Sequence, residues 1–136
     1  MYEMFEHTAD LGVVGRGDTL AEALEWAATG MLGFMADPDR VEECETVWLS
    51  IVATDREALA VDWLNELLFR FEVDGFLPTE LKVEVDTGRD SLKALCSGER
   101  YDPKRHNTLL GVKAATYHEL EVSQGVEWMV RVILDI

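Results

Sequence analysis

Two short segments of this 136-residue chain bring together side chains that could bind a metal or move a proton. The first covers residues 6–12 and is expected to place His7, Thr8 and Asp10 in an irregular stretch directly before an apolar strand. A local turn, in which Thr8 and Asp10 hydrogen-bond the nearby backbone, explains the same residues without a ligand. On these residues alone, the local turn is the favoured interpretation.

The second segment is the C-terminus, where Asp135 stands between Leu134 and Ile136 in an apolar stretch. If this strand is paired to its end, the carboxylate of Asp135 and the α-carboxylate of Ile136 are held close together. Two such charges repel each other, and each is costly to desolvate. A hard cation with oxygen ligands would relieve both costs. A frayed, solvated terminus is the equal alternative.

A third cluster, residues 100–106, is the most concentrated positive patch of the chain and includes Arg105 and His106. Lys113 follows shortly after it. One interpretation is a solvated loop with a proline turn. The other is a contact to a phosphate or to an acidic surface of a partner.

Motifs of several enzyme classes are absent. The sequence contains no phosphate-binding loop, no GxGxxG, no GxSxG and no HExxH. The three histidines, His7, His106 and His118, do not have the spacing of a zinc pair. Cys44 and Cys96 form no CxxC motif, so we expect two reduced, partly buried thiols.

The net charge of the chain limits the kinds of partner that it is expected to bind. With 27 acidic and 12 basic residues, the net charge is −15. A surface this acidic repels a phosphate backbone and favours metal cations or a basic protein surface. We therefore expect no direct nucleic-acid binding, although acidity also occurs for solubility alone or in a salt-rich or hot habitat.

The length predicts one domain over residues 1–136. Hydrophobic residues make up 48% of the chain, which is a globular share. No apolar run reaches the length of a membrane span, and the N-terminus does not resemble a signal peptide. We expect a soluble, cytoplasmic protein.

Two amphipathic helices are the clearest elements. Thr19 and Glu22 form a capping box before a helix that runs to about Phe34. Asp55 is the expected N-cap of a second helix that runs to about Phe71. Strands are expected at residues 11–15, 46–53, 81–85, 92–96, 112–118 and, after a turn at 123–125, 126–134.

The expected order is therefore β-α-β-α followed by a run of strands. Two amphipathic helices must cover one face of a mostly antiparallel sheet. This pattern predicts an α+β domain with two layers.

Four blocks of the sequence together resemble the archease family. They occur in the family's order and span almost the whole chain: His7-Thr8-Ala9-Asp10 followed by residues 17–23, then residues 61–68, 112–118 and 132–136. Any one block is weak evidence, whereas four in order are specific.

The resemblance implies a protein that activates another enzyme. Archeases assist the RtcB-type RNA ligase, which joins tRNA halves after intron removal by using GTP and manganese. The archease promotes guanylylation of the ligase, supports multiple turnover and broadens nucleotide use, but does not itself join RNA. It could act by placing a cation in the ligase or by stabilising a competent conformation of the ligase.

The resemblance also implies a metal site formed by Asp10, Asp135 and the terminal carboxylate of Ile136. Oxygen ligands favour calcium, with magnesium and manganese as alternatives, over zinc. His7 and Lys113 lie in the matching motifs and are candidate functional contacts. Arg105 and His106, from the positive patch, are further candidates.

Two other classes of function remain open. A metal-dependent hydrolase could use Asp10, Asp135 and His7, and would show phosphatase or nuclease activity in isolation. A general chaperone or adaptor would bind many proteins, whereas an activator would select one ligase.

Overall fold

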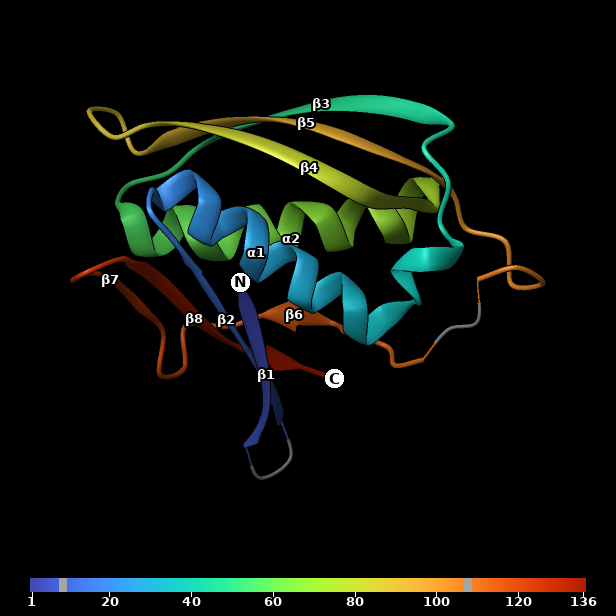
Figure 1. Cartoon of the computed structure of the whole chain (residues 1–136), viewed down its shortest axis with the longest axis horizontal. Helices are drawn as coiled ribbons and strands as arrows, with labels where there is room; N and C mark the ends of the chain where they lie inside the picture. The colour runs from blue at the N-terminus through green and yellow to red at the C-terminus, as the bar shows by residue number, and fades with distance from the viewer. Residues whose placement is uncertain (8–9, 107–108) are drawn as a thin grey trace.

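The computed structural model describes residues 1–7, 10–106 and 109–136 as two helices enclosed between two antiparallel sheets (Figure 1). The lower sheet has the order β1-β2-β8-β6, and β7 also pairs with β8. Its strands are β1 (Tyr2–His7), β2 (Asp10–Gly17), β6 (Ala114–Ala115), β7 (Glu121–Gln124) and β8 (Trp128–Asp135).

The upper sheet has three strands in the order β3-β5-β4. These strands are β3 (Glu45–Val52), β4 (Phe76–Asp86) and β5 (Ser91–Arg100). The ladder between β3 and β5 is unbroken, whereas the one between β4 and β5 shifts register at Pro78. β3 and β4 are therefore the edge strands of this sheet.

Helix α1 (Leu20–Met35) and helix α2 (Arg56–Asp74) form the middle layer, and a short 3-10 turn, η1 (Pro38–Arg40), follows α1. Thr19 caps α1 by accepting the Glu22 N–H at 3.1 Å. Asp55 caps α2 by accepting the Ala58 N–H at 2.7 Å. The predicted N-caps are confirmed.

Both helices contact both sheets, so each buries more than one stripe of its surface. In α1 the buried positions are Leu20, Ala23, Leu24, Ala27, Ala28, Gly30, Met31, Leu32 and Met35. The prediction of an α+β fold with two helices on antiparallel strands is confirmed. The expectation of one sheet and two layers was wrong, because the helices are covered on both sides.

Three local predictions also need correction. Glu6 and His7 lie in β1 and Asp10 begins β2, so they form part of a hairpin rather than an irregular segment. The strand expected at 112–118 is reduced to Ala114–Ala115, the residues of this segment that have register partners in β8. Ser123 and Gln124 belong to β7 rather than to the turn.

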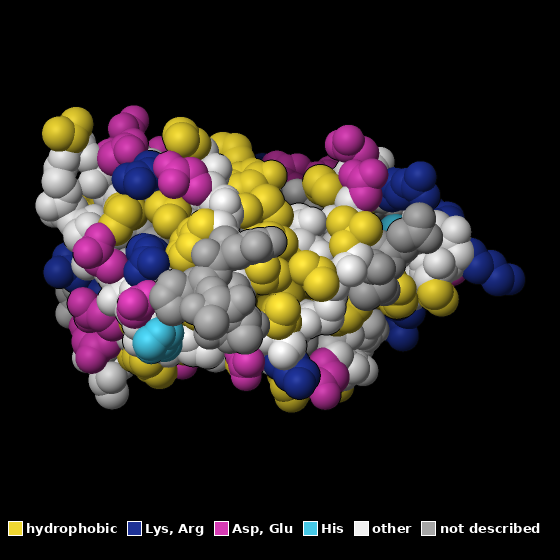
Figure 2. All heavy atoms as spheres, turned by 90° about the horizontal axis from the view of Figure 1, so that it is seen from below, with side chains coloured by type: hydrophobic (Ala, Val, Ile, Leu, Met, Phe, Trp, Pro, Cys, Tyr) yellow, Lys and Arg dark blue, Asp and Glu magenta, His cyan; other side chains and the backbone are white. Residues whose placement is uncertain are grey.

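The outer face of the lower sheet carries a band of hydrophobic side chains between charged ones (Figure 2). On this face the Phe5 ring packs over Gly12, where an added Cβ would lie 2.0 Å from a ring carbon. The guanidinium of Arg131 lies 4.8 Å from the centre of the same ring. No helix of the described chain is long and apolar enough to cross a membrane.

Candidate functional site

The backbone brings three distant segments together at the end of β8. Leu11 of β2 is the register partner of Leu134, and Ala114 of β6 is the partner of Asp135. Asp10 precedes Leu11, so its backbone begins β2 beside the end of β8. Residues that are far apart in the sequence thus meet at one sheet end.

Hydrogen bonds hold this end on the β6 side. The Lys113 N–H donates to the Asp135 carbonyl at 2.8 Å. The Thr116 N–H and hydroxyl both donate to the Ile133 carbonyl, at 3.0 and 2.9 Å. The last residues of the chain are therefore held by backbone pairing up to Asp135.

Asn65 of α2 fixes β6 from its other edge. Its Nδ2 donates to the Ala115 carbonyl at 3.2 Å, and its Oδ1 accepts the Ala115 N–H at 2.7 Å. The side chain therefore replaces a neighbouring strand and joins α2 to the segment that carries Lys113.

The chemistry of this sheet end fits a hard cation. Asp135, Ile136 and Lys113 are exposed, and neither Asp135 nor Lys113 has an ion-pair partner among the described side chains. Carboxylates on a fixed backbone that remain open to solvent suit calcium or magnesium. The side chains of Asp10 and His7 lie outside the described part, so the ligand set stays a prediction.

A second polar cluster surrounds Glu99, near the end of β5. Glu99 is 5% exposed. Its Oε1 accepts the Glu42 N–H at 3.0 Å and lies 2.5 Å from His106 Nε2, and its Oε2 forms an ion pair with Arg105. His106 Nδ1 accepts the Asp102 N–H at 2.8 Å, so Nε2 carries the proton that His106 donates to Glu99.

The cluster favours the ionised form of Glu99. The N–H of Glu42, together with His106 and Arg105, lowers the pKa of Glu99 from 4.5 to about 2, against the effect of desolvation. Desolvation and the two neighbouring carboxylates of Glu99 and Glu42 raise the pKa of the Cys44 thiol. Cys44 is thus kept protonated and is a poor nucleophile.

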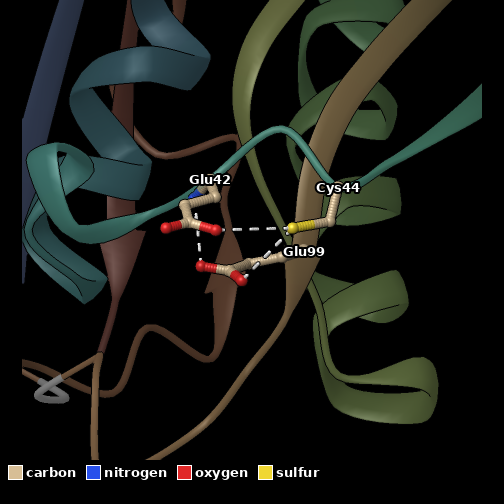
Figure 3. A group of neighbouring side chains, drawn as sticks. All are labelled: Glu42, Cys44 and Glu99. Atoms are coloured by element: carbon tan, nitrogen blue, oxygen red, sulfur yellow. Dashed lines mark hydrogen bonds between the residues drawn. The ribbon is translucent and has the colours of Figure 1, made fainter.

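The side chains of Glu42, Cys44 and Glu99 point toward one another (Figure 3). Their possible ligand atoms lie within 4.8 Å of one another, a set that could hold a metal. The positive charge is already supplied here, because the Arg105 guanidinium pairs with Glu99 and lies 4.0 Å from Glu42. The residues therefore fit an internal ion-pair cluster better than a metal site.

The Glu99 cluster accounts for two residues of the positive patch at 100–106, which pair with acidic groups inside the chain. His106 is fully buried, and Arg105 also lies 3.7 Å from Asp102. The acidic surface that Arg105 meets belongs to its own chain. Sequence reasoning missed Glu42 and Glu99 because they are 57 residues apart and no spacing rule joins them.

A family model described as the archease protein family matches residues 2–136. The chain belongs to the archease family. It is 38% identical to the protein archease of Methanosarcina acetivorans over 139 residues, covering 99% of this chain and 95% of the relative. It is 35% identical to the protein archease of Danio rerio over 137 residues, covering 99% and 85%.

A solved structure agrees with this archease in fold. The solution structure of Methanobacterium thermoautotrophicum protein 1598 superposes with a TM-score of 0.83 at 34% identity, covering 99% of this chain and 98% of that one. The layered arrangement is thus shared with a relative over nearly the full length of both chains.

Proposed function

We propose that this archease is a non-catalytic activator of an RtcB-type RNA ligase. It promotes guanylylation of the ligase and multiple turnover, and it broadens the nucleotides that the ligase accepts. The observation that carries the proposal is the match of the archease family model over residues 2–136. The protein acts in the cytoplasm, together with the ligase.

We further propose that Asp10, Asp135 and the α-carboxylate of Ile136 bind a divalent metal, with calcium preferred. The exposure of Asp135 and the backbone pairing that holds it support this assignment. A divalent cation at this end supplies positive charge that can offset the charge of a nucleotide triphosphate. The residues of this chain would orient that cation toward the ligase.

His7 and Lys113 are proposed as contacts to the ligase or to its nucleotide. The exposed ammonium of Lys113, on the segment that pairs with Asp135, supports the role of Lys113. Arg105 and His106 act indirectly in this proposal. They hold residues 101–106 against Glu99 rather than reaching a partner.

The acidic surface supports a protein partner over direct binding of RNA. The net charge of −15 repels a phosphate backbone and attracts the basic surface that an RNA-binding enzyme presents. The RNA substrate therefore contacts the ligase alone in this proposal.

The test is a ligase guanylylation assay with and without this protein. Stimulation by the wild type, and its loss in Asp10→Ala and in Asp135→Ala with the fold intact, are the expected results. Asp18→Ala, at an exposed aspartate before α1, is the matched control and should stimulate normally. Absence of stimulation by the wild type would reject the activator function, whereas full stimulation by either site variant would reject only the site. The protein alone should join no RNA.

A further inference from the structure

The edge strands of this fold differ in whether their outward-facing backbone groups are covered. On β4, the Val83 N–H donates to the carboxylate of Glu25 at 2.7 Å, and Pro78 with its register shift interrupts the ladder. On β6, Asn65 binds both backbone groups of Ala115. Such devices prevent an exposed edge from pairing with another chain.

β3 has an open edge with no such device among the described residues. The Ala53 N–H donates to the Asp90 carbonyl at 3.0 Å, one residue beyond the last β3–β5 register pair, Val52 and Ser91. Because opposite pairs in an antiparallel ladder alternate, the N–H and C=O groups of Ser50 and Val52 point away from β5. A further strand could pair with them.

The open edge forms one wall of a groove of about 630 Å³. Ser50 and Val52 line this wall, and the exposed flank of α2, with Asp62 and Glu72, lines the other. Phe69 of α2 also lines the groove and is 53% exposed. The groove thus combines unpaired backbone groups with an apolar surface.

The charge of the groove selects its ligand. Among the described residues that line the groove, Asp62, Glu66 and Glu72 are acidic and Lys113 is the one base. Glu66 is paired with Arg70 at 3.1 Å, but Asp62 and Glu72 have no ion-pair partner within the described part of the chain. These two carboxylates are ten residues apart on α2, which is about 15 Å along a helix. An extended chain covers that distance in about five residues.

We propose that the groove between β3 and α2 binds an extended, basic segment of a partner protein, which adds to the upper sheet as a strand beside β3. Side chains of a strand alternate between faces. The inward basic residues would therefore lie over Asp62 and Glu72, and the outward apolar residues beside Val52, which is 72% exposed, and Trp48, which is 66% exposed. The segment has an alternating basic and apolar sequence. This docking surface goes beyond the proposed function and does not use the metal site.

The test uses the full chain and a fluorescein-labelled peptide, Lys-Val-Lys-Val-Lys-Val-Lys, without any ligase. Fluorescence anisotropy should show saturable binding, and amide exchange should slow at Ser50 and Val52. Asp62→Asn with Glu72→Gln should weaken binding about tenfold, the effect of losing two exposed charge pairs. Glu84→Gln with Glu121→Gln, two exposed acids outside the groove, is the matched control and should change the affinity less than about twofold.

A peptide with N-methylated backbone amides tests strand pairing itself. It keeps the charge but loses the N–H donors, so it should bind at least about tenfold more weakly. Equal binding of the methylated peptide, equal loss in both double variants, or protection on another strand would overturn the proposal. Absence of saturable binding would also overturn it. None of these outcomes affects the test of the ligase activator.

Discussion

At the scale of single residues, the Glu99 cluster shows how a buried charge is retained. Glu99 accepts hydrogen bonds from a backbone N–H and from His106, and it pairs with Arg105. A buried carboxylate is tolerated when its oxygens have such donors. The cluster joins the end of β5 to the residues before β3 and to residues 101–106.

The pKa of Glu99 makes this contribution depend on pH. Its pKa is lowered from 4.5 to about 2 in the folded chain, so ionised Glu99 stabilises the fold. The stabilisation is fully present above about pH 4.5 and is lost as the pH falls toward 2. Urea unfolding should therefore find Glu99→Gln less stable than wild type at pH 7, with the difference shrinking between pH 4.5 and 2.

Glu84→Gln is the control for this series, because Glu84 is exposed on β4 and has no ion-pair partner in the described chain. The stability of Glu84→Gln in urea should equal that of the wild type at every pH of the series. A difference between Glu99→Gln and wild type that stays constant over the pH range would contradict the role given to the Glu99 charge.

At the scale of elements, the connection between α2 and β6 decides how the end of the lower sheet is built. β6 has only two residues and pairs with β8 on one side. Asn65 supplies the hydrogen bonds that a neighbouring strand would supply on the other side. A helix side chain thus completes a strand too short to be stable by itself.

The substitution Asn65→Leu should remove the two hydrogen bonds that join α2 to β6. The Ala115 N–H and C=O would lose their partners, and each unmade buried hydrogen bond costs about 1–3 kcal/mol. We expect lower stability in urea and faster amide exchange at Ala115. Asn65→Asp keeps the acceptor and should fall between Asn65→Leu and the wild type; if Asn65→Leu exchanges at the wild-type rate, the connection contributes nothing.

At the scale of the whole molecule, the helices lie between two sheets. One of these sheets contains both the β1–β2 hairpin and the end of the chain (Figure 1). Antiparallel pairing between β2 and β8 sets the start of one beside the end of the other. The proposed metal ligands are brought to one end of this sheet by topology rather than by any local motif.

Extending the chain beyond Ile136 should impair metal binding and ligase stimulation without unfolding the domain. The extension replaces a charged terminal oxygen by a neutral peptide carbonyl, and hard cations favour charged ligands. Added residues can run into solvent, because Ile136 is 38% exposed. Metal titration and ligase stimulation should therefore separate a C-terminally tagged protein from an N-terminally tagged one. Equal values for the two would show that the α-carboxylate is not a ligand.

The sequence by itself determined the local elements and the family. The caps at Thr19 and Asp55 and the period of the helices depend on neighbours within a few residues, so they could be read directly. The four motif blocks likewise identified the archease family, which the family model confirms. The α+β class followed from the order of these elements.

Only the tertiary structure decided which elements meet. A strand pattern does not specify its partner, so the division into two sheets could not be predicted, and the weakly patterned β1 was missed. The Glu42–Glu99 contact depends on pairing across 57 residues. The edge of β3 is open because no side chain of the described fold covers it. The edge of β4, by contrast, is covered by Glu25. Such contacts arise from long-range packing, which no short window of sequence contains.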